Sequence, residues 1–368
     1  MILIRRIGLS SVRNRNSKSS LVSILLLSTS VLYLPTSTSW QLSQRSITTM
    51  NSSPPRKWIE SKSVAILKCI IPLSPSSHKG SSGRVGILGG SVRYTGAPFY
   101  ASMASLKVGS DLCYVFCAQE ATVPIKCYSP ELMVAGIYSA AEFDIALEHH
   151  DEQEQGRLVA KMTLEITSMM HQMHVLVIGP GLGRCPLVMR ATSQIIKIAM
   201  ERKLSMVVDA DALFLLTLPE NRGIFQNYDK VVFTPNLVEY KRLLDAYDGD
   251  LSEATSGIII QKGAQDIISN TKNSATTIVC DEEGGLKRSG GLGDILAGTV
   301  GTFLAWNEIL SEQGHSTDRL LSCWSACCVT KKATKLAFER HQRSMTAPDV
   351  INLLGETFEN MTNKDSVV

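Results

Sequence analysis

The stretch Gly290-Gly291-Leu292-Gly293-Asp294, followed directly by apolar residues from Ile295 to Trp306, predicts a glycine turn that opens a helix. Glycine allows positive φ and leaves N–H groups uncovered, so successive amides can converge on an anion at the positive end of the helix dipole. A carboxylate at the start of that helix can act as a general base on a group bound beside the anion. The alternative is that Asp294 only caps the helix, since Asp is a favoured N-cap residue.

On either side of this turn, short apolar runs alternate with helical patterns. The predicted strands are 84–90, 112–117, 175–178, 206–208, 230–233, 258–261 and 276–280. The predicted helices are 101–109, 158–170, 187–201, 211–218, 237–246, 294–306, 320–340 and 347–360. Continuous apolar strands separated by helices are typical of a mainly parallel sheet, so the chain is predicted to be a three-layer α/β domain with helices on both faces.

Glycine or polar residues follow four of these strands at the point where each strand ends. The four loops are Gly179 to Gly183, Asp209 to Asp211, Thr234 to Glu239 and Lys262 to Asp266. Ligands of open parallel sheets bind beyond the carboxyl ends of the strands. The four loops, taken with Gly290 to Asp294, favour a functional role for Asp294 over a purely capping one.

Composition excludes several classes of protein. The 368 residues are 44% hydrophobic and 19% charged, which suits a globular protein with a sizeable core. The nine cysteines lie in apolar runs without zinc-type spacing and are expected to be buried, reduced thiols. Residues 1–59 contain eight Lys or Arg and no acidic residue, which gives this segment a charge of +8. Because the whole chain has a net charge of +3, residues 60–368 carry a net charge of −5. An acidic body argues against nucleic-acid binding.

The first residues have the composition of a targeting segment. Residues 1–53 are rich in Arg and Ser, and the apolar run 21–34 is shorter than the roughly twenty residues of a membrane span, so stable membrane insertion is not expected. A mitochondrial address is preferred; a plastid or secretory route is the alternative, and a start at Met50 would leave the protein cytoplasmic. We expect a catalytic domain over 58–361 and a tail over 362–368.

The order of the motifs resembles the ribokinase-like superfamily and, within it, the ATP-dependent (or ADP-dependent) (S)-NAD(P)H-hydrate dehydratases. The resemblance covers about residues 68 to 361. The motifs that carry it are His78-Lys79-Gly80, Gly89-Gly90, Tyr94-Thr95-Gly96-Ala97-Pro98, Tyr128-Ser129-Pro130-Glu131-Leu132, Gly179 to Gly183, Asp209-Ala210-Asp211, Thr234 to Glu239, Lys262-Gly263 and Gly290 to Asp294.

The resemblance implies a lyase that repairs hydrated nicotinamide cofactors. ATP, with Mg²⁺, would phosphorylate the ring hydroxyl of the S-epimer of hydrated NADH or NADPH (NADHX and NADPHX), and loss of phosphate would restore the double bond. Phosphoryl transfer depends mostly on positioning and charge stabilisation, so the site should need anion cradles, Mg²⁺ and one base. The partners would be small molecules, and a homo-oligomer is possible.

The resemblance also implies a role for each motif. Asp294 would be the base, and Gly291, Leu292 and Gly293 would form the anion hole for the transferring phosphoryl group. Substrate would contact Asp294, Gly181, Asn236, Leu237, Val238, Glu239, Tyr240, Lys241 and Arg242. The nucleotide would contact Lys262, Gly263, Ala264, Gln265 and Asp266, and also Gly284, Gly285, Leu286, Lys287, Arg288, Ser289, Gly290, Gly291, Leu292 and Gly293. Glu239 would act on Mg²⁺ through water, since that ion keeps several waters.

Simpler structural roles remain open for three acids. Glu239 could be a first-turn acid favoured by the helix dipole, and Asp209 and Asp211 could be helix caps.

Two departures from the family pattern leave the function open. The family usually has Cys-Gly-Gly-Gln-Gly-Asp where this chain has Ser289 to Asp294 with Leu292 at the Gln position. The polar stretch between Tyr247 and Ile258 is also short, so helix 237–246 would have to serve as the crossover and the layer beside it would lose a cover. The alternatives are therefore a small-molecule kinase of the same fold and a catalytically silent nucleotide-binding protein. The sequence does not decide NADH against NADPH, ATP against ADP, or the oligomeric state.

Overall fold

The fold is that of a computed structural model, which describes residues 61–363 except for the side chains of 273–275. The predicted targeting segment 1–53 and the tail from 364 lie outside the described residues. The strands are β1 (Arg84–Leu88), β2 (Leu112–Ala118), β3 (Met133–Tyr138), β4 (Val175–Ile178), β5 (Ser205–Val208), β6 (Val231–Phe233), β7 (Ile258–Gln261), β8 (Asp266–Asn270) and β9 (Asn273–Cys280). The α-helices are α2 (Lys62–Leu67), α3 (Gly96–Val108), α4 (Gln119–Tyr128), α5 (Ala140–Glu148), α6 (Glu152–Met169), α7 (Pro186–Glu201), α8 (Ala210–Leu215), α9 (Leu237–Ala246), α10 (Leu292–Glu312), α11 (Arg319–His341) and α12 (Ala347–Thr362).

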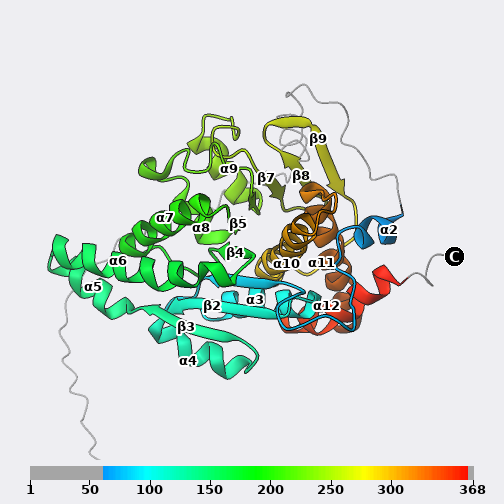
Figure 1. The fold of residues 1–368 in the computed structure, drawn as a ribbon, viewed down its shortest axis with the longest axis horizontal. Coiled ribbons are helices and arrows are strands. Elements are labelled where there is room, and N and C mark those ends of the chain that lie inside the picture. Colours follow the sequence, from blue (N-terminus) through cyan, green and yellow to red (C-terminus); the bar gives the residue numbers. More distant parts are fainter. Residues whose placement is uncertain (1–60, 364–368) are drawn as a thin grey trace, which may run out of the picture. The chain divides into compact units, whose positions relative to one another are not determined.

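The nine strands form one sheet in the order β3-β2-β1-β4-β5-β6-β7-β8-β9 (Figure 1). The pairs from β3 to β7 are parallel, and β7, β8 and β9 pair antiparallel at one end of the sheet. The mainly parallel sheet predicted from the sequence is therefore confirmed. The chain runs from β1 outward to β2 and β3, and then resumes at β4 on the other side of β1. The topological switch point, where ligands of such sheets bind, therefore lies between the neighbouring strands β1 and β4.

Helices cover both faces of the sheet because the connections on the two sides of this switch point run in opposite directions. Right-handed crossovers place α3, between β1 and β2, and α7, between β4 and β5, on opposite faces. Helix α10 packs against α3 and against β1, β4 and β5, and nearly all of its residues from Ile295 to Leu310 are buried. The helix that begins at the glycine turn is therefore the central helix of its layer.

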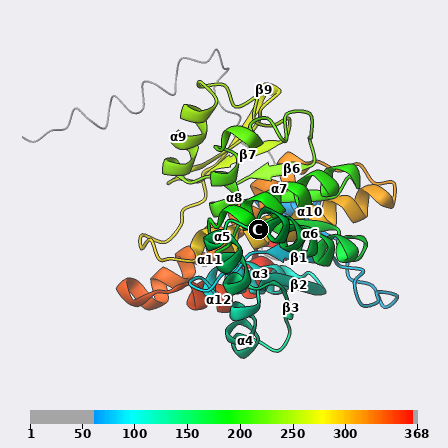
Figure 2. The same cartoon turned by 90° about the vertical axis from the view of Figure 1, so that its left-hand side faces the viewer.

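Five helices and strands were not predicted from the sequence, namely α2, α4, β3, α5 and β8. Helix α4 contains Pro124, and β3 contains Gly136, so both interrupt the usual patterns. A Cβ on Gly136 would lie 3.0 Å from the Cα of Gln119, so glycine lets α4 pack closely on β3 (Figure 2). Strand β8 begins at Asp266, inside the loop predicted to be 262–266.

Helix α9 is the crossover between β6 and β7, as the short connection after it required. The following residues 247–257 fold back as turns, and Phe225 and Thr255 form a parallel bridge. The side chains of Tyr247, Leu251 and Ala254 are buried, and the Tyr247 hydroxyl donates to the Leu216 carbonyl at 3.1 Å. The short stretch therefore supplies its own cover in place of a further helix.

Most of the cysteines are buried, as the sequence predicted. Of the nine, seven are buried, whereas Cys185 is half-buried and Cys127 is exposed, so the expectation of burial was wrong for Cys127. Cys127 lies near the end of α4, an amphipathic surface helix that the sequence reading missed. Within residues 61–363 no helix has both the length and the apolar character needed to cross a membrane.

Candidate functional site

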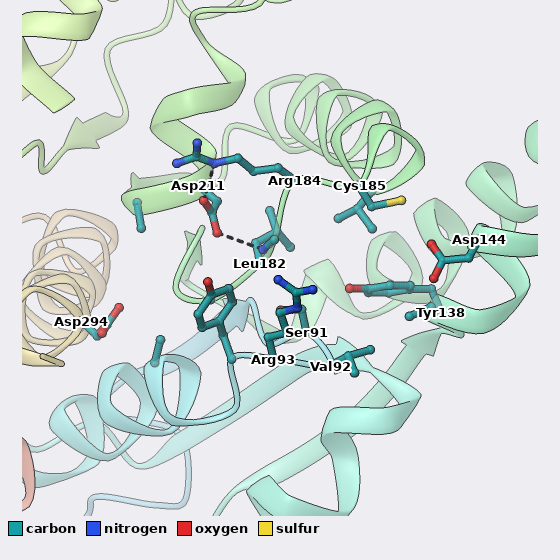
Figure 3. Close-up of a pocket in the computed structure, with 17 residues that line it drawn as sticks. Ser91, Val92, Arg93, Tyr138, Asp144, Leu182, Arg184, Cys185, Asp211 and Asp294 are labelled. Carbon is teal, nitrogen blue, oxygen red and sulfur yellow. Dashed lines mark hydrogen bonds and ion pairs between the residues drawn. The ribbon is translucent and has the colours of Figure 1, made fainter. Parts of the chain in front are cut away.

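A cavity of about 740 Å³ lies where the loops after β1 and β4 meet, at the switch point of the sheet. Figure 3 shows Asp294 at one end of the cavity and Tyr138 and Asp144 at the opposite end. The residues that line it are Ser91, Val92, Arg93, Tyr94, Ala97, Tyr138, Ala140, Asp144, Gly181, Leu182, Gly183, Arg184, Cys185, Val188, Ala210, Asp211 and Asp294. Its volume is that of a site for a drug-sized or larger ligand.

Close backbone contacts hold the loops that form this cavity. The Gly90 amide donates to the Pro180 carbonyl at 3.0 Å, which ties the β1 loop to the β4 loop. Gly179 has φ +122°, and a Cβ there would lie 1.8 Å from the Asp209 carbonyl oxygen. No other residue type fits at Gly179, so the glycine predicted to end β4 is needed to bring the β4 and β5 loops together.

The β5 loop places Asp209 in a buried charge cluster. Ala210 has φ +47°, a left-handed conformation that is costly for alanine and bends the chain directly after Asp209. The Asp209 Oδ1 atom accepts from the Lys262 Nζ atom at 2.9 Å and from the Thr234 Oγ1 atom at 2.8 Å. Although Asp209 stands at the N-cap position of α8, its side chain makes no capping bond there. The capping-only interpretation of Asp209 is therefore wrong.

Asp211 is not a capping residue in the usual sense either. Its carboxylate accepts from the Gly183 amide at 3.0 Å and from the Arg184 Nε atom at 2.9 Å. The guanidinium of Arg184 also lies over the Phe214 ring, 4.2 Å from its centroid. Asp211 thereby fixes the β4 loop to α8 on one wall of the cavity.

Asp294 is the third residue of α10 and lies in its first turn. Helix α10 begins at Leu292, its N-cap is Gly291 with φ +93°, and no side chain caps it. Asp294 is half-buried and lines the cavity, so it does not serve as the helix cap. Burial raises the pKa of Asp294 to about 7, with a further increase from the nearby Asp209 carboxylate, while the Lys262 ammonium lowers it. A carboxyl group with this pKa is suited to accept a proton near neutral pH.

Lys262 points into this cluster and away from the rest of its predicted loop. A Cβ on Gly293 would lie 3.2 Å from the Lys262 Nζ atom, so the ammonium stands beside the glycine turn. Burial lowers the pKa of Lys262, but Asp209, Glu239 and Asp294 together raise it above its usual value. The lysine is therefore held in its charged form next to the turn.

The predicted substrate segment Asn236 to Arg242 forms the first turns of α9 and does not line the cavity. Asn236 and Glu239 form a capping box: the Asn236 side chain accepts from the Val238 and Glu239 amides, and Glu239 Oε2 accepts from the Asn236 amide at 2.8 Å. Leu237, Val238 and Lys241 are exposed. Burial raises the pKa of Glu239, while Lys262 and Arg242 lower it, so the carboxylate also faces the lysine side of the cluster.

The two predicted nucleotide loops both rest on α11. Lys331 Nζ donates to the Gly263 and Ala264 carbonyls at 2.9 and 3.0 Å and pairs with Asp266 at 3.2 Å. The Gly285 amide donates to Thr334 Oγ1 at 3.2 Å. Asp266 is buried in this contact and holds the Gly263 amide, so its carboxylate shapes the loop and is not available at the surface.

The remaining nucleotide-loop residues offer mostly backbone and exposed side chains. Gln265, Leu286, Arg288 and Gly290 are exposed, while Lys287 and Ser289 are partly buried. The Leu292 side chain is partly buried and packs against the hydrophobic core. At this position the glycine turn can therefore offer a ligand only its backbone amide.

Several cavity residues were not selected from the sequence. Tyr94 and Ala97 lay in a motif that was recognised without a role, and Arg93 and Arg184 were not singled out. Tyr138 and Asp144 come from β3 and α5, whose pattern was not recognised, so no sequence signal pointed to them. Asp211, by contrast, belongs to the loop after β5 that the sequence pattern did single out.

Comparisons with known proteins agree with this architecture. A sequence model of the NAD(P)H-hydrate dehydratase family matches residues 85–355. The ATP-dependent (S)-NAD(P)H-hydrate dehydratase of Pediculus humanus subsp. corporis is 38% identical over 315 residues, which span 80% of this chain and 96% of that protein.

Two solved structures show the same fold at low sequence identity. A ribokinase-like superfamily protein from Enterococcus faecalis V583 is 23% identical with a TM-score of 0.61, over 83% of this chain and 96% of that one. The ADP/ATP-dependent NAD(P)H-hydrate dehydratase of Bacillus subtilis, co-crystallised with ATP and Mg²⁺, is 17% identical with a TM-score of 0.56, over 80% and 96% of the two chains. This chain has the fold of the ribokinase-like protein, and by the extent of the sequence match it belongs to the NAD(P)H-hydrate dehydratase family.

Proposed function

We propose that this protein is an ATP-dependent (S)-NAD(P)H-hydrate dehydratase, a hydro-lyase that returns the S-epimer of hydrated NADH or NADPH to NADH or NADPH. The observation that carries the proposal is the position of Asp294. Its carboxylate lines the cavity at the switch point and stands directly after the glycine turn, so it adjoins both a substrate space and a predicted phosphate site.

The reaction removes two protons and needs one leaving group. Asp294 accepts the proton of the hydroxyl at C6 of the hydrated ring, the oxygen attacks the γ-phosphorus of ATP, and ADP leaves. The C6–O bond then breaks, the oxygen departs with phosphate, and the proton on C5 passes to solvent as the C5–C6 double bond forms. Phosphate is the better leaving group, which is why ATP is consumed in a net dehydration.

The residues beside Asp294 provide the charge stabilisation that phosphoryl transfer requires. The amides of the turn Gly291 to Gly293 face the transferring group at the positive end of α10. The Lys262 ammonium, held beside Gly293 by Asp209, adds a full positive charge at that place. In this proposal Lys262 acts on the transferring phosphoryl group. The two loops that rest on α11, Gly263 to Asp266 and Gly284 to Ser289, bind the rest of the nucleotide.

The donor set near Lys262 suits a hydrated magnesium ion better than a protein cage. Among the described residues, no group of three or more His, Cys, Asp or Glu side chains could hold a metal. Mg²⁺ keeps several waters and takes few carboxylates. Glu239 uses Oε2 in its capping box, and we assign its Oε1 to a water of Mg²⁺; the ion would supply charge neutralisation of the ATP phosphates.

The substrate side is assigned to Gly181 and to the segment Asn236 to Arg242. Gly181 lines the cavity directly. The segment at the start of α9 lies outside the cavity, so in this proposal it contacts substrate at the rim near Lys262. Support for that placement is the electrostatic coupling of Glu239 to Lys262 and Asp209.

We also propose that residues 1–53 direct the protein to mitochondria and that the catalytic domain spans 58–361. Arg-rich, acid-free composition supports the address. A fusion of residues 1–53 to a fluorescent protein should co-localise with a mitochondrial marker; plastid, secretory or diffuse signal would reject it.

The function is tested by incubating the chain from Met50 onward with hydrated NADH, ATP and Mg²⁺. We expect recovery of the absorbance of reduced nicotinamide together with release of free phosphate and ADP. Failure to recover NADH would reject the dehydratase, and formation of ADP without free phosphate would indicate a kinase that keeps the phosphoryl group on its product.

A further inference from the structure

The cavity extends well beyond the reacting end of the proposed substrate. In Figure 3, Asp294 stands at one end and Tyr138 and Asp144 at the other, with Arg93 and Arg184 between them. A hydrated nicotinamide dinucleotide has a diphosphate between its two nucleosides. With the hydrated ring at Asp294, the diphosphate must lie further along the cavity, where these arginines are found.

The two arginines differ in how their charges are used. Arg184 is fixed by Asp211 at 2.9 Å and by the Phe214 ring, so its charge is compensated. Arg93 is exposed at the cavity wall, and within residues 61–363 it has no carboxylate partner at ion-pair distance. Figure 3 shows its guanidinium pointing from the β1 loop towards Leu182. Arg93 is therefore the cation of the cavity that is available to a ligand.

The loop that carries Arg93 is fixed to the sheet. The backbone amides of Ser91 and Tyr94 each donate to the other residue's carbonyl, at 3.2 and 3.1 Å, so Arg93 is the third residue of a tight four-residue turn. A Cβ on Gly181 would lie 2.9 Å from both the Tyr94 Cβ atom and its carbonyl oxygen, which places this turn against the β4 loop. The base of the Arg93 side chain is thus held by the same contacts that form the cavity.

We propose that Arg93 binds the diphosphate of the dinucleotide substrate, an inference that rests on the proposed function and extends it to a second part of the substrate. An arginine fork matches the oxygens of a phosphate in a bidentate manner, and a guanidinium without a carboxylate partner gives up no ion pair when it binds. Arg93 acts on affinity and takes no part in the chemistry at C6.

The test compares ligands with and without the diphosphate. NADH, the product, carries it, and reduced nicotinamide riboside does not. Binding of each is measured by nicotinamide fluorescence, with a non-hydrolysable ATP analogue present to occupy the nucleotide site. We expect Arg93→Ala to weaken NADH binding about 10- to 100-fold and to leave riboside binding unchanged. Arg93→Lys should fall between, because it keeps the charge and loses the fork.

Arg190→Ala is the matched control, since Arg190 is exposed on α7 and does not line the cavity. Equal loss of NADH and riboside binding, or unchanged NADH binding in Arg93→Ala, would overturn the proposal. If NADH binding depends on Arg93 and hydrated NADH is not converted, the diphosphate site stands and the proposed function fails. If turnover occurs, the KM for hydrated NADH should rise in Arg93→Ala while kcat stays near that of the wild type.

Discussion

Asp294 experiences opposing electrostatic effects, and their balance sets its proposed role. Burial and the Asp209 carboxylate disfavour the charged form, whereas the Lys262 ammonium favours it, and the resulting pKa is about 7. A base with this pKa is deprotonated in a large fraction of molecules at neutral pH and still binds a proton well. The same balance has a cost, because a buried carboxylate destabilises the folded state whenever it is ionised.

Replacement of Asp294 by Asn should separate these two effects. We expect turnover to fall by about 10²- to 10⁴-fold, with ATP affinity retained. The folded-state pKa lies above the ordinary value of 3.8, so the penalty of the wild type grows as pH rises from about 4 to 7 and is complete above that. Asp294→Asn should therefore raise the free energy of unfolding at pH 8.5 by on the order of 2–4 kcal/mol, and by little at pH 4. Thermal unfolding at both pH values measures this; equal effects at both would contradict it.

The pH dependence of turnover should report Asp294 and Lys262 together. In the wild type, kcat should rise through pH 7 as the carboxyl group loses its proton. In Lys262→Met the acid limb should move to higher pH by about one unit or more, since the charge that lowers the pKa is gone. Lys197→Met, an exposed change on α7, should leave the limb in place. A limb that does not move in Lys262→Met would exclude Lys262 as a neighbour of the base.

The start of α10 depends on one backbone conformation. Gly291 has φ +93°, and a Cβ there would lie 2.5 Å from the Tyr100 ring, whereas a Cβ on the neighbouring Gly290 meets nothing within 4 Å. Gly291→Ala should lower the free energy of unfolding by about 1–3 kcal/mol. Gly290→Ala, the adjacent control, should change it by no more than about 0.5 kcal/mol. Chemical unfolding measures both, and equal values would show that the turn is not the one described.

The connection after α9 is held by the buried side chain of Tyr247. Tyr247 is only 1% exposed. Its hydroxyl donates to the Leu216 carbonyl and accepts from the Gly223 amide at 3.2 Å. Tyr247→Phe leaves both backbone groups without this partner and should cost about 1–2 kcal/mol of unfolding free energy. Tyr240→Phe, a change of the same atoms at a half-buried position of α9, should cost much less. A neutral Tyr247→Phe would mean that residues 247–257 do not pack as described.

The elements show what local sequence does and does not decide. Strands such as β4 and β5 are short apolar runs that end in glycine or aspartate, so both their existence and the loops after them could be predicted. Strand β3 could not be, because Gly136 is required by the approach of α4, a contact between two elements. Likewise the direction of the Lys262 side chain depends on its ion pair with Asp209, which lies 53 residues earlier in the chain. The left-handed conformation of Ala210 bends the backbone directly after Asp209.

At the scale of the whole molecule, the sheet order decides where the site lies. The order of β1 and β4 creates the switch point, and nothing in the sequence states which strands are neighbours. The sequence did place Gly181 and Asp294 in one site, and both line the cavity. It placed 236–242 there as well, whereas these residues lie at the start of α9 outside the cavity, because the crossover to β7 carries them away from the β1 and β4 loops.

The described fold includes α2, which begins at Lys62. Ala65 and Ile66 are fully buried, and Lys62 Nζ pairs with Glu282 Oε2 at 2.6 Å, so α2 is part of the core packing near α11 and α12. A chain that begins at Pro72 should melt several degrees lower than one that begins at Met50, because it loses the buried apolar side chains of α2. Equal melting temperatures for the two chains would show that α2 contributes nothing.

In the proposed reaction ATP phosphorylates the C6 hydroxyl of hydrated NADH, and this oxygen leaves as phosphate. Hydrated NADH that carries ¹⁸O in that hydroxyl, incubated with ATP and Mg²⁺, reveals where the oxygen goes. Mass spectrometry of the released phosphate should find one ¹⁸O atom in each phosphate formed together with NADH, and Asp294→Asn should form this labelled phosphate about 10²- to 10⁴-fold more slowly. Recovery of NADH with unlabelled phosphate, and with the label in water, would contradict the account.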